Sequence, residues 1–372
     1  MAIIGSVVVV GCGKIGSAIV KLLHAAGRFK LKVVEQHTPL LESVAHLKGV
    51  ETASFDVHDA ALLRQAIQGW NVVVSACSYD VNPLIANTCA ETGCSYFDLT
   101  EDVETTRRIR ALAEQARPGQ IFMPQCGLAP GFIGILAWDI CRHFDKLDSV
   151  KMRVGALPKY PTNRMMYNLT WSTDGLINEY CNLCEAIQDH QTMNLVALEG
   201  LEQISLDGVV YEAFNTSGGL GTLCETLQGN VRELNYKTVR YRGHQYLMQF
   251  LIRELQLGDT HKRAMLKSIL EEAVPMTRQD VVLTFASVQG WRNGQFEQMT
   301  DARKIYHKKF HGETWSSIQL TTASSLCAVV DLYFAGRVPQ QGFVRQEDVR
   351  LSDFLATEFG EVYKTAEPIM HA

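Results

Sequence analysis

Three glycines near the start of the chain have the spacing of a phosphate-binding turn. The segment VVVVGCGKIGSAIVKLL carries Gly11, Gly13 and Gly16 as G-x-G-x-x-G, after a valine run typical of a buried strand and before a helical stretch. In such a turn the first glycine makes a sharp bend, the second lets the backbone approach a pyrophosphate, and the third lets the helix pack closely on the strand. The N–H groups at the helix start would then face the phosphates. The expected dinucleotide contacts are Gly11, Gly13, Lys14, Ile15 and Gly16.

An acidic residue at the end of the next expected strand bears on which dinucleotide would bind. The carboxylate of Glu35 can accept hydrogen bonds from both hydroxyls of an adenosine ribose. It would repel a 2′-phosphate, and the residues that follow, Gln36, His37 and Thr38, provide no arginine to offset that repulsion. The sequence therefore favours NAD over NADP.

Further cofactor contacts are expected in the turns after the other strands, because ligands of such sheets bind at the carboxyl ends of the strands. The adenine edge would lie at the third strand and the nicotinamide ribose at the fourth. The loop MPQCGLAPGF after the sixth strand would approach the nicotinamide. A plain turn role stays open for Asp56. The expected contacts are Asp56, Val57, Ser75, Ala76, Cys77, Pro130 and Gly131.

The elements that would hold these residues alternate along the first 125 residues. Short valine- and isoleucine-rich runs alternate with helical stretches, which predicts a parallel sheet covered on both faces in the doubly wound Rossmann arrangement. After Pro130 the strands become longer and aromatic residues more frequent, which indicates a second, α+β domain. Its strands are expected near residues 149–155, 209–213, 238–242 and 281–289, with a hairpin around RNGQ and a long helix over 314–336.

Composition restricts the class of partner. The chain has 372 residues, 47% of them hydrophobic and 20% charged, with a net charge of −5. An acidic balance argues against a general nucleic-acid or membrane-surface binder, so a small molecule is the expected partner. Ten scattered cysteines form no disulfide framework and indicate a reducing cytoplasm. We expect neither a signal peptide nor a transmembrane span.

Several segments together resemble one known family. They are GCSYFDLTEDVE, QCGLAPGF, TWSTDGLINEY, FNTSGGLGTL, KTVRYRGHQYL and GFVRQEDVRLSDFL, in addition to the glycine motif. In this order they resemble the saccharopine dehydrogenase-like oxidoreductases, and within them the lysine 6-dehydrogenase-type branch. The glycine motif alone is generic, whereas the segments beyond Pro130 make the resemblance specific.

The resemblance implies hydride exchange between NAD(P) and a carbon–nitrogen bond, in which CH–NH is oxidised to an imine. The substrate would be lysine or a lysine-derived amine such as saccharopine. It also implies a Rossmann domain at 1–130, a substrate and oligomerisation domain at 131–313, and a segment at 314–372 that returns to the first domain. A homodimer is expected by the same resemblance. A reductase of a polyamine precursor such as carboxynorspermidine, and a non-catalytic NAD-sensing protein, remain alternatives.

An amino-acid substrate of this kind requires a cation for its carboxylate and a group that moves protons. In KTVRYRGHQYL, Arg240 and His244 match the family's Arg-Tyr-x-Gly-His segment, and Gly243 would let the chain bend so that both side chains converge. Arg240 would bind the carboxylate and His244 would carry the proton. A structural ion pair and a helix cap are their respective alternatives. Arg242 shares the face of Arg240 by strand alternation and is the second candidate.

The remaining candidates lie in the other matching segments. Asp98 and Cys126 follow expected strands and are candidate catalytic residues, although Asp98 is equally suited to cap the next segment. Cys181 and Cys184 have metal-ligand spacing, but no second pair accompanies them. We expect two buried cysteines within a helix, and no metal site. Candidate substrate contacts, each with a turn, cap or core alternative, are Thr216, Ser217, Trp171 and Ser172.

Overall fold

The computed structural model describes residues 3–310 and 312–364 and divides the chain into two compact units. Unit 1 comprises the residues up to Phe132 together with the segment from Thr321 to Lys364. Unit 2 runs from Ile133 to Leu320. The segment from Thr321 to Lys364 thus belongs to the same unit as the N-terminal residues.

Unit 1 contains a seven-stranded sheet in which every pairing is parallel. The strand order is β17-β6-β5-β4-β1-β2-β3, so the order reverses at β1, as in doubly wound folds. The predicted Rossmann fold class is confirmed. The seven strands are β1 (Gly5–Val10), β2 (Phe29–Val34), β3 (Val50–Ala53), β4 (Val72–Ser75), β5 (Ser95–Phe97), β6 (Ile121–Met123) and β17 (Gly342–Phe343).

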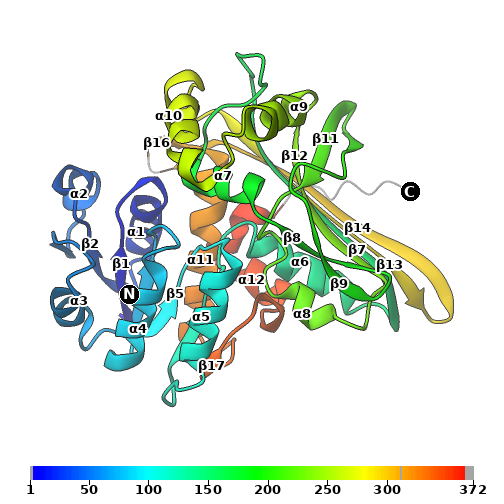
Figure 1. The fold of residues 1–372 in the computed structure, drawn as a ribbon. Coiled ribbons are helices and arrows are strands. Elements are labelled where there is room, and N and C mark those ends of the chain that lie inside the picture. The colour runs from blue at the N-terminus through cyan, green and yellow to red at the C-terminus, as the bar shows by residue number, and fades with distance from the viewer. Residues whose placement is uncertain (1–2, 311, 365–372) are drawn as a thin grey trace. The chain divides into compact units, whose positions relative to one another are not determined.

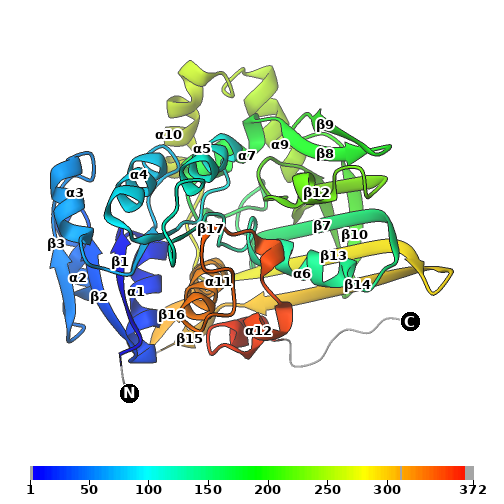
Figure 2. The same ribbon diagram turned by 90° about the horizontal axis from the view of Figure 1, so that it is seen from below.

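Helices flank this sheet, and Figure 2 shows α3, α4 and α5 in a row on one side of the strands, with α1 and α11 on the other. The strands between them are buried on both faces. Val7, Val8, Val9 and Val10 of β1 are all fully buried, as expected for a covered parallel sheet. The helices are α1 (Lys14–Ala26), α2 (Thr38–Ala45), α3 (Ala60–Ile67), α4 (Asn82–Thr92), α5 (Val103–Ala113), α11 (Ser317–Phe334) and α12 (Leu351–Ala356).

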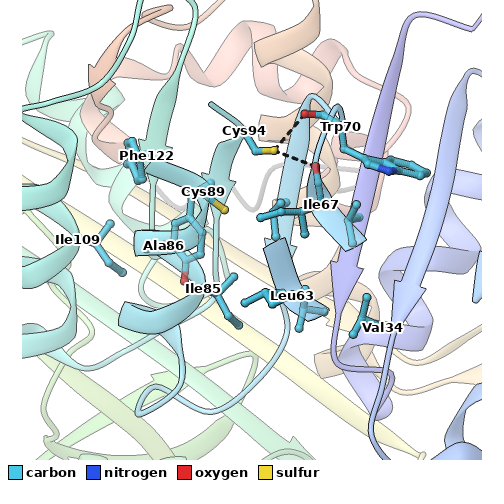
Figure 3. Packing of buried hydrophobic residues seen from close by; sticks show 14 of the residues in the cluster. Val34, Leu63, Ile67, Trp70, Ile85, Ala86, Cys89, Cys94, Ile109 and Phe122 are labelled. Carbon is cyan, nitrogen blue, oxygen red and sulfur yellow. Dashed lines mark hydrogen bonds between the residues drawn. The ribbon is translucent and has the colours of Figure 1, made fainter. Parts of the chain in front are cut away.

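A buried cluster joins α3, α4 and α5 to the sheet of unit 1 (Figure 3). The thiol of Cys94 lies in this cluster and donates to the carbonyls of Ile67 at 3.2 Å and Trp70 at 3.1 Å. Cysteine acts here as a small apolar residue with a weak donor. Members of the cluster include Val34, Leu63, Ile85, Cys89, Ile109 and Phe122.

Unit 2 contains a mixed eight-stranded sheet, drawn in green to yellow in Figure 1. Its order is β10-β11-β12-β7-β13-β14, and β8 pairs with β12 and β9. The pairing of β12 with β7 is parallel and its other pairings are antiparallel. The strands are β7 (Lys146–Pro158), β8 (Cys184–Gln188), β9 (Gln191–Leu195), β10 (Glu202–Leu206), β11 (Val209–Asn215), β12 (Glu233–Tyr241), β13 (Asp280–Arg292) and β14 (Gln295–Tyr306).

The expected hairpin around RNGQ is confirmed, because β13 and β14 pair directly across Asn293 and Gly294. Both turn residues have positive φ, 52° and 76°, as a two-residue turn between strands requires. A short pair, β15 (Lys308–Phe310) and β16 (Glu313–Trp315), follows. The helices of unit 2 are α6 (Phe132–Cys141), α7 (Thr173–Cys181), α8 (Leu223–Leu227), α9 (His244–Gln249) and α10 (Arg263–Ala273), with η1 (Phe250–Glu254) a π-helix and η2 (Thr260–Lys262) a 3-10 turn.

Three expectations about this region are wrong in detail. Cys181 ends α7 and Cys184 begins β8, so the two cysteines do not share a helix. Arg242 lies beyond the end of β12 and is exposed. The helix expected from residue 314 begins at Ser317, because the buried carboxylate of Asp280 accepts hydrogen bonds from the N–H groups of Ser317 and Ile318.

Candidate nucleotide and substrate sites

The glycine loop of unit 1 has different packing demands at its three glycines. A Cβ on Gly16 would lie 2.0 Å from the carbonyl oxygen of Gly11, so only glycine lets α1 approach this closely. Gly11 has φ +93°, and its Cβ would lie 2.9 Å from the carbonyl oxygen of Ala76. A Cβ on Gly13 would meet nothing within 4 Å. The protein itself does not require glycine at position 13, which suits a position where a bound pyrophosphate needs the space.

Glu35 connects this loop to the end of β2. Its Oε2 accepts from the N–H of Cys12 at 2.8 Å and its Oε1 from the N–H of His37 at 2.9 Å. An ionised carboxylate has about four acceptor positions, so two remain for the hydroxyls of a ribose. Glu35 therefore holds the loop in place and fits an adenosine ribose at the same time.

The two expected contacts after β3 differ in their surroundings. Asp56 is exposed, and its carboxylate accepts from the backbone N–H of His58 at 3.0 Å and from its Nδ1 at 2.8 Å. These hydrogen bonds lower the pKa of Asp56. Val57 packs against the buried cluster of Figure 3.

After β4, the hydroxyl of Ser75 donates to Asn82 Oδ1 at 2.7 Å. Ala76 is half-buried and stands next to the glycine loop, since its carbonyl oxygen is the close neighbour of Gly11. Burial raises the pKa of the Cys77 thiol to about 11, so this thiol is protonated at neutral pH. The turn after β4 thus supplies hydroxyl and backbone groups rather than a thiolate.

Asp98 joins the carboxyl ends of neighbouring strands. It is fully buried, and its Oδ2 accepts from Tyr96 at 2.8 Å and from Asn82 at 3.2 Å. Its Oδ1 accepts from the N–H groups of Thr100 at 3.0 Å and Gln125 at 2.9 Å. Burial raises the pKa of Asp98 to about 6, although three of these hydrogen bonds act in the opposite direction. The carboxyl group holds the ends of β5 and β6 and the start of α4 together.

The loop after β6 is folded tightly on itself. A Cβ on Gly131, where φ is +137°, would lie 1.9 Å from the carbonyl oxygen of Gly127, and Pro130 immediately precedes this close contact. The Cys126 thiol is buried and donates to the carbonyl of Met123 at 3.0 Å. Burial raises its pKa well above the ordinary value, so the thiol carries no thiolate character at neutral pH.

Two glutamines beside this loop carry buried oxygens without a partner. Gln346 donates through Nε2 to the carbonyls of Pro124 at 2.8 Å and Gln125 at 2.9 Å, which fixes the orientation of its amide. The Oε1 atoms of Gln125 and Gln346 have no hydrogen-bond partner. Buried acceptors of this kind call for a donor from a ligand or a water molecule. They lie at the carboxyl end of β6, in the half of the sheet that receives the nicotinamide in Rossmann folds.

In unit 2, Arg240 projects from β12 into a group of aromatic side chains. It is 3% exposed, and its Nε donates to the Tyr180 hydroxyl at 2.9 Å. Its guanidinium lies 5.1 Å from the ring centre of Tyr167 and 5.8 Å from that of Tyr180. Burial acts against its charge, but Tyr180, Tyr167 and Glu179 outweigh burial and raise its pKa. Arg240 is therefore a permanent buried cation.

His244 begins α9, after Gly243 turns the chain with φ +96°, and meets Arg240 through Tyr180. Its Nδ1 lies 3.0 Å from the carbonyl oxygen of Met165 and its Nε2 lies 3.1 Å from the Tyr180 hydroxyl. A carbonyl oxygen only accepts, so Nδ1 carries the proton and Nε2 accepts from Tyr180. Burial and the charge of Arg240 lower the pKa of His244 to about 3. The imidazole is neutral at physiological pH.

The other expected substrate contacts lie around α7. The Ser217 N–H donates to the carbonyl of Glu179 at 3.0 Å, and the hydroxyl oxygen of the adjacent Thr216 is buried without a partner. Ser172 accepts from the N–H of Gly175 at 3.2 Å and caps α7. The Trp171 ring packs against Gly175, where an added Cβ would lie 2.3 Å away.

Sequence reasoning missed the residue that connects the group, Tyr180. It ends TWSTDGLINEY, a segment quoted for the resemblance, but its hydroxyl meets His244 across 64 positions of the chain. Tyr167, Glu179, Gln125 and Gln346 were also missed, because nothing in their local sequence distinguishes them from core or capping residues. Within residues 3–310 and 312–364, no three potential metal ligands form a group.

The glycine loop and the parallel sheet of unit 1 are those of a dinucleotide-binding protein. A family model described as the saccharopine dehydrogenase NADP binding domain matches residues 7–123, and the saccharopine dehydrogenase C-terminal domain matches residues 127–362. The chain belongs to the saccharopine dehydrogenase family, and is an NAD(P)-dependent oxidoreductase with a nicotinamide cofactor.

Two solved structures share this fold. The apo saccharopine dehydrogenase (L-Glu forming) of Saccharomyces cerevisiae matches with a TM-score of 0.78 and 16% identity, over 96% of this chain and 98% of that one. The homospermidine synthase of Legionella pneumophila, solved with NAD, matches with a TM-score of 0.66 and 11% identity, over 98% and 90%. None of the helices described here is long and apolar enough to cross a membrane.

The glycine loop yields a prediction from a matched pair of variants. Gly13→Val meets open space at an ordinary φ of −68°, so unfolding free energy should change by less than about 0.5 kcal/mol while affinity for NADH falls at least about tenfold. Gly16→Ala should instead destabilise the protein by about 1–3 kcal/mol, because its Cβ meets the Gly11 carbonyl. Urea unfolding measures the free energy of unfolding of each variant, and fluorescence titration measures its affinity for NADH. Unchanged NADH affinity in Gly13→Val would contradict the assignment.

His244 makes stability depend on pH in a defined direction. Its pKa is lowered from 6.5 to about 3. Between these pH values the unfolded chain therefore binds a proton at His244 that the native state does not bind. The stabilisation is complete above pH 6.5 and is lost as pH falls toward 3, by about 1.4 kcal/mol per pH unit. His244→Gln, which cannot titrate, should lose this component of the slope between pH 6.5 and 4.5. Parallel stability curves for the two proteins would show that the pKa of His244 is not lowered in the native state.

Proposed function

We propose that the protein is an NAD-dependent oxidoreductase that acts on a carbon–nitrogen bond of lysine or a lysine-derived amino acid such as saccharopine. The observation that carries this proposal is the buried cation of Arg240 in unit 2. Its hydrogen bonds go to neutral oxygens, the Tyr180 hydroxyl and the Val239 carbonyl, which leaves other N–H groups of its planar fork for a carboxylate.

The cofactor is proposed to be NAD rather than NADP. The residues present fit the dinucleotide: Gly13 leaves space for a pyrophosphate, and Glu35 retains acceptor positions for a ribose. The Oε1 atoms of Gln125 and Gln346 are buried acceptors that suit the amide of a nicotinamide. When bound, the nicotinamide supplies hydride transfer. The carboxylate of Glu35 disfavours a 2′-phosphate, which supports NAD even though the family model is described as NADP binding.

Roles for the residues of unit 2 follow from their hydrogen bonds. Arg240 would hold the substrate carboxylate, and Thr216, with its unpartnered hydroxyl, would contact a polar group of the substrate. His244 accepts from Tyr180 and is neutral, which favours a positioning role over proton transfer near neutral pH. Tyr180, held by His244 and accepting from Arg240, would keep the guanidinium fork oriented.

The polyamine-precursor reductase stays the alternative within the same fold. Carboxynorspermidine also carries a carboxylate, so Arg240 would suit it, but the NADPH preference expected for that reaction is disfavoured by Glu35. We also propose a homodimer, by the family resemblance alone, and a cytoplasmic location, which the ten free cysteines support.

The activity is tested by following reduced nicotinamide by absorbance. The pure protein is incubated with NAD or NADP and lysine, saccharopine, ornithine or a polyamine precursor, and with the reduced cofactors in the reverse direction. We expect an absorbance change with NAD and an amino acid of the lysine group. If no amine changes the absorbance with any cofactor form while NADH still binds, the protein is a non-catalytic NAD-binding protein instead.

Arg240 yields a prediction with a neighbouring control. Arg240→Gln removes the cation, so the KM for the amino acid should rise about 10- to 100-fold while NADH affinity stays unchanged. Arg242→Gln changes the same charge at an exposed position outside β12 and should leave the KM unchanged. Thermal unfolding checks that both variants fold. Equal effects of the two substitutions would remove the proposed role of Arg240.

A further inference from the structure

The sheet of unit 2 carries a polar pocket on the face opposite Arg240. Along β12, Arg240 points to one face and Lys237 to the other, because side chains alternate. On the face of Lys237 lies a cavity of about 310 Å³. Its lining includes Lys151 and Arg153 of β7, which pair with Asn235 and Lys237 of β12 and therefore share their face.

This cavity lies in a hollow made by curling of the sheet. β10 and β14 are the two edges of the strand order, yet the segment between β10 and β11 reaches β14 through an ion pair of Asp207 with Lys304. Glu202 of β10 accepts from Arg153 through Oε1 and from Lys237 at 2.8 Å through Oε2. Since β10 is bound both to β7 and to β12, the curl encloses space, as in the mouth of a barrel.

Apolar side chains fill one part of this face and leave the cavity region polar. Leu157, Ala213, Val239 and Leu283 form a buried cluster together with Tyr211. The cavity lies beyond them along the same strands, where polar residues such as Ser287 replace the apolar ones.

A directed chain of hydrogen bonds ends on Ser287. Gln289 donates to Gln298 at 2.7 Å, Gln298 donates to Thr300 at 3.2 Å, and Thr300 donates to Ser287 at 3.2 Å. The Ser287 oxygen is the final acceptor, so its own O–H is left to donate. Ser287 pairs directly with Lys151 across β13 and β7, which brings a hydroxyl donor and an ammonium group to the same part of the cavity.

The charges on this face sum to a single positive charge. Lys151, Arg153 and Lys237 face Glu202 and Glu233. Both oxygens of Glu202 are already bound by Arg153 and Lys237, and Arg153 is only 2% exposed. Lys151 lies 3.7 Å from Glu233, at the limit of an ion pair, and is 41% exposed. Lys151 is thus the most weakly paired of the three cations, and its ammonium group is available to a ligand.

We propose that this cavity binds a small metabolite that carries a carboxylate. The oxyanion would accept from the Ser287 hydroxyl and the Lys151 ammonium, with Arg153 adding its positive potential. The carbon part of the ligand would lie against Phe285 and Ile204, which also line the cavity. A net charge of one favours a monoanionic carboxylate group over a phosphate dianion. This site is independent of the proposed catalytic function.

Calorimetric titration with butyrate, a monocarboxylate, tests the proposal on the full chain. The Arg240→Gln background is used, so that a carboxylate held at the candidate substrate site does not contribute to the heat. We expect one butyrate bound per chain, with affinity at least about tenfold lower after Lys151→Ala and about fivefold lower after Ser287→Ala. Lys30→Ala, which removes a half-exposed, ion-paired lysine in unit 1, is the matched control and should bind as before.

Four outcomes would overturn the proposal. The first is no heat on addition of butyrate, and the second is equal butyrate affinity in Lys151→Ala and Lys30→Ala. The third is tighter binding of inorganic phosphate than of butyrate, and the fourth is a dimer in sedimentation that Lys151→Glu dissociates. The last would show that a second copy of the chain covers this face. Thermal unfolding of each variant checks that a lost signal comes from the cavity and not from loss of fold.

Discussion

The alternation of side chains along β12 is the constraint on which both polar regions of unit 2 depend. Successive residues of a strand point to opposite faces, so Arg240 and Lys237 serve different environments although they are close in sequence. β12 lies inside the sheet, between β11 and β7, and a shift of one residue would move every side chain to the wrong face. The strand thereby separates the aromatic surroundings of Arg240 from the hollow that contains Arg153.

Burial then determines which of these groups carry charge. Arg240 remains a cation because the hydroxyls of Tyr180 and Tyr167 and the carboxylate of Glu179 compensate for its burial. The same cation helps to keep His244 neutral. In unit 1, burial raises the pKa of Asp98, while four donors keep its carboxyl group fixed between strand ends. In both units, hydrogen bonds orient the buried titratable groups, which suits holding a ligand in one geometry.

The first unit was predictable in nearly all its elements because its signals are local. Fully buried parallel strands read as continuous apolar runs, and the turns between them carry glycine and polar residues. β17 was missed because two residues give no periodic signal, and only pairing with β6 makes them a strand.

In unit 2, β9 was missed because its residues are mostly exposed and polar. β10 was missed because its apolar residues are only half-buried. The start of α11 was misplaced because its cap, Asp280, is distant in the chain.

By itself the sequence determined the nucleotide cradle, since each glycine acts through the backbone next to it and the carboxylate of Glu35 follows at the end of the next strand. The resemblance of several segments indicated the family, which the family models then showed. Only the tertiary structure shows that Arg240 is buried whereas Arg242 is exposed, because β12 ends before Arg242. It also decided that His244 is neutral and bound to Tyr180, because burial and contacts across 64 residues are properties of packing and not of the local sequence.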